Sequence, residues 1–501
     1  MFRKILIANR GEIAVRVIRT CRALGIPTVA VYSEVDRHAL HVLQADEAIC
    51  IGAPEPNESY LNIPRIIEAA QQAGADAIHP GYGFLSENAT FSQACQDANI
   101  TFIGPPPEVI SSLGDKLTAR KLMLENNIPV TPGALLEGDD LNAWKQQAET
   151  LGYPIMIKAS AGGGGKGMRV VHHPDEFEAA CKNAASEARS AFGDDRVYME
   201  KYIANPRHIE VQIFADTHGH AIHLFERECS IQRRHQKIIE ECPSPVIDEA
   251  LRTKMGETAV QAALAANYVN AGTVEFLFDP SDRSFYFLEV NTRLQVEHPI
   301  TECITGLDLV QWQIMIASGQ PLPLSQEQIQ RDGHAIECRL YAEDAERQFA
   351  PSPGTITGLH MPTGPGIRVD EGVYEGAEVP VYYDPILSKL VCYGPDRETT
   401  RQRMVDALRH TAILGLNTSI SFLIDALEHE AFRSGDLSTH FIQQHMADWR
   451  PKRDDKDLAA IAFLLNEYLM PAQKSHTSSS GDHEELPTPW QTIGTWRIGQ
   501  S

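Results

Sequence analysis

The chain has 501 residues, 43% of them hydrophobic, which is enough for roughly two to four domains with buried cores. Its 67 acidic residues outnumber its 44 basic ones and give a formal charge of −23, which argues against a general binder of nucleic acids or of anionic membranes. The nine cysteines are scattered and contain no C-x-x-C pair, so we expect reduced thiols rather than a disulfide framework or a zinc site. Neither a membrane span nor a signal peptide is visible, and we expect a cytoplasmic protein.

The first hundred residues alternate between strand and helix patterns. Strands are expected at residues 4–9, 26–33, 75–80 and 100–106. Helices are expected from Gly11 to Gly25 and at residues 58–73 and 86–98. The alternation predicts an open, mostly parallel α/β layer. Its first strand–helix turn lacks the G-x-G-x-x-G fingerprint of a dinucleotide cofactor.

The pattern changes near residue 115. A helix is expected at 116–127, and strands at 153–160 and 168–171 flank a run of glycines. A third region, roughly 333–445, opens with a strand at 333–344 and continues through a segment rich in glycine and proline. At the end, we expect an apolar helix at 455–470 and a polar linker at 474–488.

The glycine-rich run AGGGGKG (161–167) is not a Walker loop. Gly167 and Met168 follow its lysine, where the Walker pattern needs Ser or Thr and then a helix. Four glycines can bring backbone N–H groups close to phosphates and can close as a lid; the alternative is a plain flexible turn. Lys158, at the end of the preceding strand, favours phosphate binding.

Residues 273–300 predict a hairpin that carries paired carboxylates. Two short strands flank a PSDRS turn, and a hairpin symmetric about Asp282 places Glu275 directly opposite Glu289. Like charges in this position destabilise a sheet unless a cation lies between them. Oxygen ligands suit magnesium, and Asn291 offers a third oxygen.

A dense polar cluster follows the hairpin. Glu297 is a candidate general base, with its pKa set by Arg293 and the metal; the alternative is a salt-bridged structural pair. Upstream, residues 226–241 form a basic island that suits an anionic substrate such as phosphate or bicarbonate, although a solvated charged face is the commoner explanation. This island contains Arg227, Arg233, Arg234, His235 and Lys237.

Three further positions are weaker signals when taken alone. Glu200 and Lys201 end a strand and precede a connector that can hold an adenine through its backbone, or be a surface linker. Arg339 lies on a strand, where a permanent positive charge can hold an oxyanion or form a structural salt bridge. His79 is expected to be a satisfied core or loop histidine.

Together these segments resemble the biotin carboxylase family of ATP-grasp enzymes. The resemblance covers residues 1 to about 445 and rests on the motifs KILIANRGEIAVRVIR, HPGYGFLSEN, IKASAGGGGKGM, ERECSIQRRHQKIIEE, FLEVNTRLQVEHPITE and GHAIECRLYAED. It implies that ATP activates bicarbonate as carboxyphosphate, and that the carboxyl group passes to biotin on a carrier protein, the first half-reaction of an acetyl-CoA or acyl-CoA carboxylase.

The resemblance also implies roles for individual residues. Those expected to hold ATP are Lys116, Lys158, Glu200, Lys201, His208, Gln232 and His235, with Gly163, Gly164 and Gly165 in the lid. Those expected to bind Mg²⁺ or Mn²⁺ are Glu275, Glu289 and Asn291. Bicarbonate is expected to contact Lys237, Arg293, Gln295 and the Val296 backbone, with Glu297 as the base and Arg339 stabilising the biotin enolate.

The family fold implies α/β and α+β domains in series. We expect an N-terminal pre-ATP-grasp domain with an open parallel sheet at 1–114, an ATP-grasp domain with the lid at 115–330, a C-terminal domain at 331–446 and a tail at 447–501. Family members dimerise through the first and third regions, so a homodimer is expected, with Arg16 and Arg19 in the matching helix.

Several partners are expected on separate chains. The sequence has no Met-Lys-Met biotin site and no carboxyltransferase segment, which implies separate carrier and transferase subunits. The tail 489–499 looks like the junction of a propionyl- or methylcrotonyl-type α subunit, so a split or shortened α subunit is expected, and a subunit of pyruvate carboxylase is another context. Another ATP-grasp ligase, or a scaffold without activity, are the competing classes.

Overall fold

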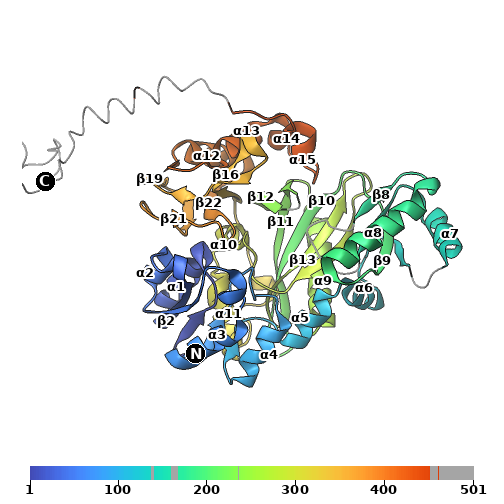
Figure 1. The fold of residues 1–501 in the computed structure, drawn as a ribbon. Helices are drawn as coiled ribbons and strands as arrows, with labels where there is room; N and C mark the ends of the chain where they lie inside the picture. The colour runs from blue at the N-terminus through green and yellow to red at the C-terminus, as the bar shows by residue number, and fades with distance from the viewer. Residues whose placement is uncertain (137–139, 160–167, 235, 452–460, 462–501) are drawn as a thin grey trace, which may run out of the picture. The chain divides into compact units, whose positions relative to one another are not determined.

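The computed structural model describes residues 1–136, 140–159, 168–234, 236–451 and 461. The chain divides into two compact units, Met1–Trp449 and Arg450–Ser501, and every element below belongs to the first (Figure 1). The predicted lid glycines 163–165, His235 and, residue 461 aside, the predicted tail elements lie outside the described residues. No helix in the described part is both long and apolar enough to cross a bilayer.

The N-terminal region is the predicted parallel sheet with its helices. In spatial order its strands are β3 (Glu47–Gly52), β2 (Thr28–Ser33), β1 (Ile5–Ile7), β4 (Ala77–His79) and β5 (Thr101–Phe102), all paired in parallel. Its helices are α1 (Gly11–Ala23), α2 (Leu40–Gln44), α3 (Ile63–Ala73) and α4 (Ala89–Asp97). The edge strand β3 and helix α2 were not predicted, because their short segments carry no clear periodicity.

Helix α1 shows why the N-terminal prediction was correct. Its predicted apolar positions Ile13, Val17 and Ile18 are buried on one face, as a helical period of 3.6 residues requires. The helix ends at Ala23, and Gly25 follows with a φ of 70°, the left-handed conformation typical of a residue just beyond a helix.

An eight-stranded antiparallel sheet forms the centre of the unit. In spatial order it contains β14 (Ser284–Asn291), β13 (Asn270–Asp279), β10 (Arg207–Ala215), β11 (Ala221–Arg233), β12 (Gln236–Cys242), β15 (His334–Tyr341), β22 (Ile386–Gly394) and β20 (Ile367–Glu371). Associated helices are α5 (Pro107–Gly114), α6 (Lys116–Glu125), α9 (Glu249–Ala265), α10 (His298–Thr305) and α11 (Leu309–Ala317). Because β12 pairs with β15, one sheet crosses the boundary predicted at residue 330.

The predicted hairpin is the β13–β14 pair at the edge of this sheet. Glu275 lies opposite Glu289, as predicted. The symmetry about Asp282 does not extend toward the turn, since Phe276 pairs with Phe287 and a bulge separates the two registers.

A separate four-stranded sheet lies beside helices α7 (Leu141–Leu151) and α8 (Phe177–Phe192), in the green and teal part of Figure 1. Its spatial order is β6 (Gly133–Leu135), β9 (Val197–Lys201), β7 (Ile155–Ala159) and β8 (Arg169–Val171). Lys158 is on β7, while Glu200 and Lys201 are on β9, the adjacent strand. This sheet therefore brings together candidate nucleotide-binding residues that are about forty positions apart in the sequence.

The C-terminal region packs helices on the far part of the central sheet. These helices are α12 (Arg397–Arg409), α13 (Ile420–Glu428), α14 (Glu430–Ser434) and α15 (Phe441–His445). Short antiparallel pairs join β16 (Glu343–Asp344) to β17 (Ala350–Pro351), β18 (Gly354–Thr355) to β21 (Glu378–Val379), and β19 (Gly358–His360) to β23 (Ala412–Leu414). Ile231 and Ile239 share a core with these helices, which ties the regions together.

Helix α1 makes its polar contacts within the chain. The Arg16 guanidinium is buried and lies 2.7 Å from Glu302 and 2.9 Å from Asp308, so this side chain is engaged inside the unit. Arg19 is half exposed and lies 3.0 Å from Asp370 on β20. Both arginines lie on α1, the helix of the predicted dimer contact, and Arg19 is the one of the two that presents its side chain to the surface of the single chain.

Arg397→Met is expected to destabilise the fold through a buried ion pair. Arg397 on α12 contacts Glu241 on β12 at 2.7 and 3.0 Å. Burial opposes ionisation of Glu241, but Arg397 and His334 outweigh it and lower its pKa to about 2. Since removing one partner leaves a buried charge, the free energy of unfolding should fall by about 3–5 kcal/mol in urea titrations at pH 7.

The pH dependence of this loss has a definite sign. A depressed folded-state pKa contributes stability that is present above the unfolded value near 4.5 and is lost as pH falls toward 2. The difference in the free energy of unfolding between wild type and Arg397→Met should therefore become smaller below pH 4.5. Arg409→Met, on the same helix, breaks the exposed pair with Glu428 and should change stability by less than about 1 kcal/mol. Equal losses in the two variants would contradict the assignment.

Candidate active site

Lys237 lies at the centre of a buried carboxylate cluster. It is the second residue of β12, and its ammonium contacts Glu210, Glu275 at 2.7 Å and Glu297 at 2.7 Å. These three carboxylates raise the pKa of Lys237 far enough to outweigh its burial, so the ammonium stays charged. The arrangement holds a fixed positive charge among acidic groups, as a site for an anionic substrate requires.

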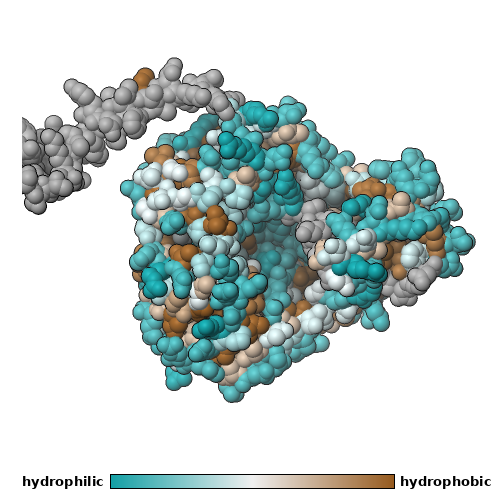
Figure 2. Space-filling model, in the orientation of Figure 1, coloured by the Kyte–Doolittle hydropathy of each residue, from teal (hydrophilic) through white to brown (hydrophobic). Residues whose placement is uncertain are grey.

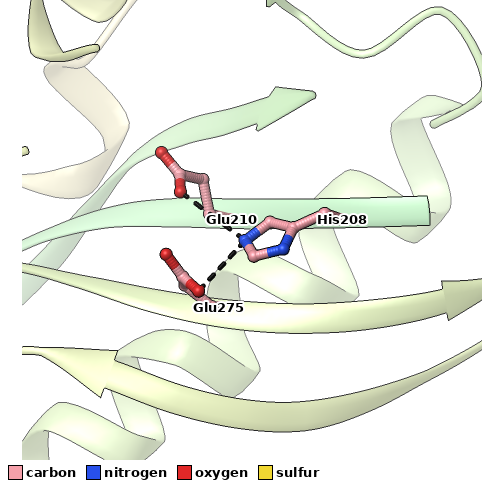
Figure 3. Close-up of side chains that lie close together, drawn as sticks. All are labelled: His208, Glu210 and Glu275. Carbon is pink, nitrogen blue, oxygen red and sulfur yellow. Dashed lines mark ion pairs between the residues drawn. The ribbon is translucent and has the colours of Figure 1, made fainter. Parts of the chain in front are cut away.

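Strand β10 supplies two members of this cluster through its two-residue period. His208 and Glu210 point to the same face of β10, toward Glu275 on the neighbouring strand β13 (Figure 3). The His208 Nε2 atom is 3.0 Å from Glu275 and 4.0 Å from Glu210. Burial opposes the imidazolium, but Glu275 outweighs it and the pKa of His208 is raised. Glu210 was missed by the sequence prediction, although alternation from His208 was the signal for it.

Glu297 is the N-cap residue of α10 and is fully buried. One carboxylate oxygen is 2.7 Å from Lys237, and the other is 2.8 Å from the Arg339 guanidinium. Burial alone would raise its pKa, but Lys237, Arg339 and Arg227 together hold the pKa well below its usual range. The positive end of the α10 dipole acts in the same direction.

The environment of Glu297 corrects one prediction. Its pKa was expected to be set by Arg293 and the metal, whereas the cations that dominate are Lys237, Arg339 and Arg227. Arg293 instead contacts Glu87 at 2.8 Å, Gln295 at 2.8 Å and Asn291 at 3.2 Å. It orders the connector between β14 and α10. Its partner Glu87 was also missed, although it lies in the HPGYGFLSEN segment.

The carboxylates on the β13–β14 hairpin fit a hard divalent cation. Glu275 accepts from Lys237 and from Asn291 Nδ2 at 2.7 Å each. Glu289 lies 3.5 Å from Lys116, and the Asn291 Oδ1 atom accepts from Arg293. All three side chains offer oxygen, two of them as carboxylates facing each other, and this donor set is the kind that magnesium prefers.

The candidate nucleotide residues are spread over neighbouring elements. Lys158 on β7 lies 2.5 Å from the Glu200 carboxylate on β9, which also binds Arg120 at 2.9 Å. Lys201 is exposed at the end of β9, and Gln232 donates to the Cys229 carbonyl at 2.8 Å. The remaining predicted members, His235 and the lid glycines 163–165, lie outside the described residues.

Arg339 joins the site from the C-terminal region. It lies on β15 and contacts Glu240 on β12 at 2.6 Å as well as Glu297. Both carboxylates are fully buried, and burial raises the pKa of Glu240 while Arg339 opposes that rise. Arg339 is therefore brought to Glu297 by the pairing of β12 with β15, which the sequence prediction did not contain.

The predicted basic island is divided by the structure. Arg227 is fully buried and binds Glu210 at 2.5 Å, so it supports the cluster from behind. Arg233 turns to Glu343 at 2.8 Å and lies over the Phe349 ring. Among the island residues that the structure describes, Lys237 is the one that contacts the carboxylate of Glu297. Figure 2 shows that this face is hollowed where Figure 1 labels β11 and β12, and that hydrophilic residues line the hollow.

Three family models match the chain in series. They are "Biotin carboxylase, N-terminal domain" at residues 1–110, "Carbamoyl-phosphate synthase L chain, ATP binding domain" at 115–325 and "Biotin carboxylase C-terminal domain" at 337–444. A biotin carboxylase of Nostoc sp. is 55% identical over 445 residues, covering 88% of this chain and 99% of that protein. The chain belongs to the biotin carboxylase family. The middle model bears the name of another ATP-grasp enzyme, so the two flanking models decide between these classes.

Other members of the biotin carboxylase family extend the match. A methylcrotonoyl-CoA carboxylase α subunit of Dictyostelium discoideum is 49% identical, over 99% of this chain and 71% of that protein. The Campylobacter jejuni biotin carboxylase, solved as a beta-gamma-ATP complex, has a TM-score of 0.85 and 48% identity over 89% of this chain and 99% of that one. These likenesses confirm the predicted family and its three-part architecture; the individual domain boundaries stay predictions.

Proposed function

We propose that this chain uses ATP and bicarbonate to carboxylate biotin carried by a separate protein. The observation that carries the proposal is Glu297, an ionised carboxylate held between Lys237 and Arg339 in a buried site of a biotin carboxylase fold. Its depressed pKa keeps Glu297 ionised at neutral pH, which is the protonation state that a general base requires. A structure of a Hydrogenobacter thermophilus biotin carboxylase domain dimer contains MgADP and bicarbonate, which supports these ligands.

The first step is the activation of bicarbonate. Glu297 takes the bicarbonate proton, and the freed oxygen attacks the γ-phosphorus of ATP, so that a P–O bond forms to the carbonate and the bond to ADP breaks. The products are carboxyphosphate and ADP. Lys237 neutralises charge beside Glu297, while Arg293, Gln295 and the Val296 backbone orient the bicarbonate.

The second step passes the carboxyl group to biotin. The nitrogen of the biotin ureido group loses its proton to phosphate and forms a C–N bond to the carboxyl carbon as the C–O bond to phosphate breaks. Before that C–N bond forms, the deprotonated ureido group carries negative charge on its oxygen, and Arg339 is placed to stabilise this enolate as a permanent cation. Arg339 contacts Glu297 at 2.8 Å, so the groups proposed to act on biotin and on bicarbonate are adjacent.

The nucleotide set is proposed from the resemblance to the biotin carboxylase family. Lys116, Lys158, Glu200, Lys201, His208, Gln232 and His235 would hold ATP, with the glycines 163–165 as a lid. Glu275, Glu289 and Asn291 would hold magnesium or manganese, which when bound supplies positive charge to the transferring phosphoryl group. The Lys237 ammonium already orders Glu275 for that role.

The test is release of phosphate from ATP that depends on both bicarbonate and free biotin. Omitting either should lower the rate by at least about tenfold, because the chemistry needs both acceptors. Phosphate release that does not depend on biotin would indicate another ATP-grasp ligase. No release under any condition, with ATP bound, would indicate a scaffold.

A second proposal concerns the final acceptor. The match to the methylcrotonoyl-CoA carboxylase chain of Dictyostelium runs over 99% of this chain, whereas the match to the Nostoc biotin carboxylase covers 88%. We therefore favour an acyl-CoA of the propionyl or methylcrotonyl type over acetyl-CoA, the acceptor that begins fatty acid biosynthesis. A pyruvate carboxylase chain from Methanothermobacter thermautotrophicus, 54% identical over 95% of this chain and 96% of that protein, keeps pyruvate as the alternative. Carboxylation assays with separate carrier and transferase proteins and each acceptor distinguish them.

The assembly and compartment are proposals as well. Arg19 is exposed on α1, and the Hydrogenobacter structure is a dimer, so we expect a homodimer. Light scattering will measure the mass of the assembly. All nine cysteines are free thiols, which agrees with a reducing cytoplasm.

A further inference from the structure

Lys389 is a buried lysine directly behind the proposed bicarbonate site. It lies on β22, where it is the cross-strand partner of Arg339 on β15. Its side chain has no exposed surface, and its ammonium donates to the backbone carbonyl of Val296 at 3.0 Å. Val296 lies between Gln295 and Glu297 in the connector from β14 to α10. None of the sequence motifs that predicted the site includes a role for this lysine.

The other neighbours of Lys389 come from the N-terminal and C-terminal regions. Its ammonium is 3.2 Å from Glu12 on α1 and 4.0 Å from Asp370 on β20, and it lies over the Tyr82 ring at 5.6 Å. Glu12 is itself buried, and burial raises its pKa to about 7 against the opposing effect of Lys389. A lysine that is fully buried must be paired, and here the pairing reaches across three regions of the unit.

The contact with Val296 fixes the geometry of the catalytic connector. A peptide unit is planar, so holding the Val296 carbonyl also fixes the plane of the Glu297 N–H and the position of the Glu297 Cα atom. The Gln295 carbonyl on the other side accepts from His298 Nδ1 at 2.8 Å. The connector is therefore held from both sides, by α10 and by strand β22 of the central sheet.

We propose that Lys389 is a positioning residue that holds the Gln295–Glu297 backbone in the shape that binds bicarbonate. This inference rests on the proposed function. Lys389 does not touch the reacting atoms; it acts through the Val296 carbonyl. Its removal lets the connector relax, so bicarbonate binds less well, whereas the nucleotide residues on β7 and β9 keep their contacts.

The competing explanation is purely structural. Lys389 could matter only because it neutralises Glu12, and Lys389→Met would then harm the fold by leaving that carboxylate buried without a cation. The double variant Lys389→Met/Glu12→Gln separates the two explanations, since it removes the unpaired charge and still lacks the contact with Val296. Asp370 keeps Arg368 at 2.7 Å in every variant.

The experiment compares wild type, Glu12→Gln, Lys389→Met and the double variant. We expect the double variant to recover the melting temperature of Glu12→Gln, yet to show a KM for bicarbonate raised by at least about tenfold with a KM for ATP within about twofold of wild type. Glu12→Gln alone should keep a bicarbonate KM within about twofold, because its Lys389–Val296 contact remains.

Two results would overturn the inference. A double variant with a wild-type KM for bicarbonate would make Lys389 a counter-charge for Glu12 and nothing more. A parallel rise in the KM for ATP would mean that the whole site is disturbed. A wild-type protein without bicarbonate-dependent ATP cleavage would refute the proposed function itself, and that result is visible before any variant is compared.

Discussion

Replacing Glu297 by glutamine is expected to lower biotin-dependent ATP cleavage by about a hundredfold to ten-thousandfold, the range for loss of a general base. The amide has the size of the carboxylate but cannot accept the bicarbonate proton. ATP should bind as in wild type, because Glu297 contacts Lys237 and Arg339 and none of the nucleotide residues on β7 or β9. Steady-state phosphate release and equilibrium titration with ATP measure the two quantities.

The fold should survive this substitution. Lys237 keeps Glu210 and Glu275, and Arg339 keeps Glu240, so neither cation is left alone. Glu343→Gln is a matched control, since Glu343 is also a buried glutamate paired with an arginine, Arg233, but lies outside the cluster. It should retain activity within about threefold of wild type. Near-normal turnover by Glu297→Gln would falsify the assignment of the base.

Local patterns predicted the parts of this site that lie within one hairpin. The opposition of Glu275 and Glu289 follows from the two-residue period of strands and a short turn, both of which are written in adjacent residues. The bulge beside Glu275 was not predictable, because it depends on how Phe276 and Phe287 pack in the core. The pairing of side chains across a short hairpin can be predicted from adjacent residues, whereas a bulge in the pairing depends on tertiary packing.

The charged groups that surround Glu297 depend on the order of the strands in the central sheet, and local sequence patterns do not predict that order. Glu240 reaches Arg339 only because β12 pairs with β15, two strands separated by about ninety residues of chain. The same pairing places Arg339 beside Glu297, so the groups that set the pKa of the base belong to strands far apart in sequence. The resemblance to a family supplied roles for Arg339 and Glu297, but gave none for Glu240, which contacts Arg339, or for Glu210, which contacts Lys237 in the same cluster.

Arg16 shows the same limit from the other direction. An arginine on an amphipathic helix is usually exposed, and nothing in the local sequence marks Arg16 as an exception. In the structure Glu302 and Asp308 bury it within the chain, and Arg368 approaches Glu302 from β20 at 2.7 Å. A charged residue becomes a core residue when partners from distant segments surround it, and only the packed fold reveals those partners.

Replacing Arg339 by methionine is expected to separate the two half-steps of the reaction. The biotin-dependent rate should fall by at least about a hundredfold, since the cation that stabilises the enolate is lost. Slow ATP cleavage that needs bicarbonate but not biotin should fall by less than about tenfold, because Lys237 still holds Glu297. Both rates come from phosphate release with and without free biotin.

The acid limb of the residual reaction gives a second, independent readout. Arg339 is one of the cations that lower the pKa of Glu297, so its removal raises that pKa and the base is protonated at a higher pH than in wild type. The bicarbonate-dependent rate of Arg339→Met should therefore begin to decline at a higher pH than that of wild type when the pH is lowered. If the biotin-dependent rate falls but the pH at which the bicarbonate-dependent rate declines does not change, Arg339 acts on biotin alone.

The double variant Arg339→Met/Glu240→Gln tests whether the loss is structural. Without Arg339, Glu240 is a buried carboxylate deprived of its 2.6 Å partner, which by itself can destabilise the site. Glutamine at position 240 removes that charge and should restore thermal stability. If it also restores the biotin-dependent rate, Arg339 serves only to neutralise Glu240. If the rate stays low in a stable protein, the guanidinium itself is needed for carboxyl transfer.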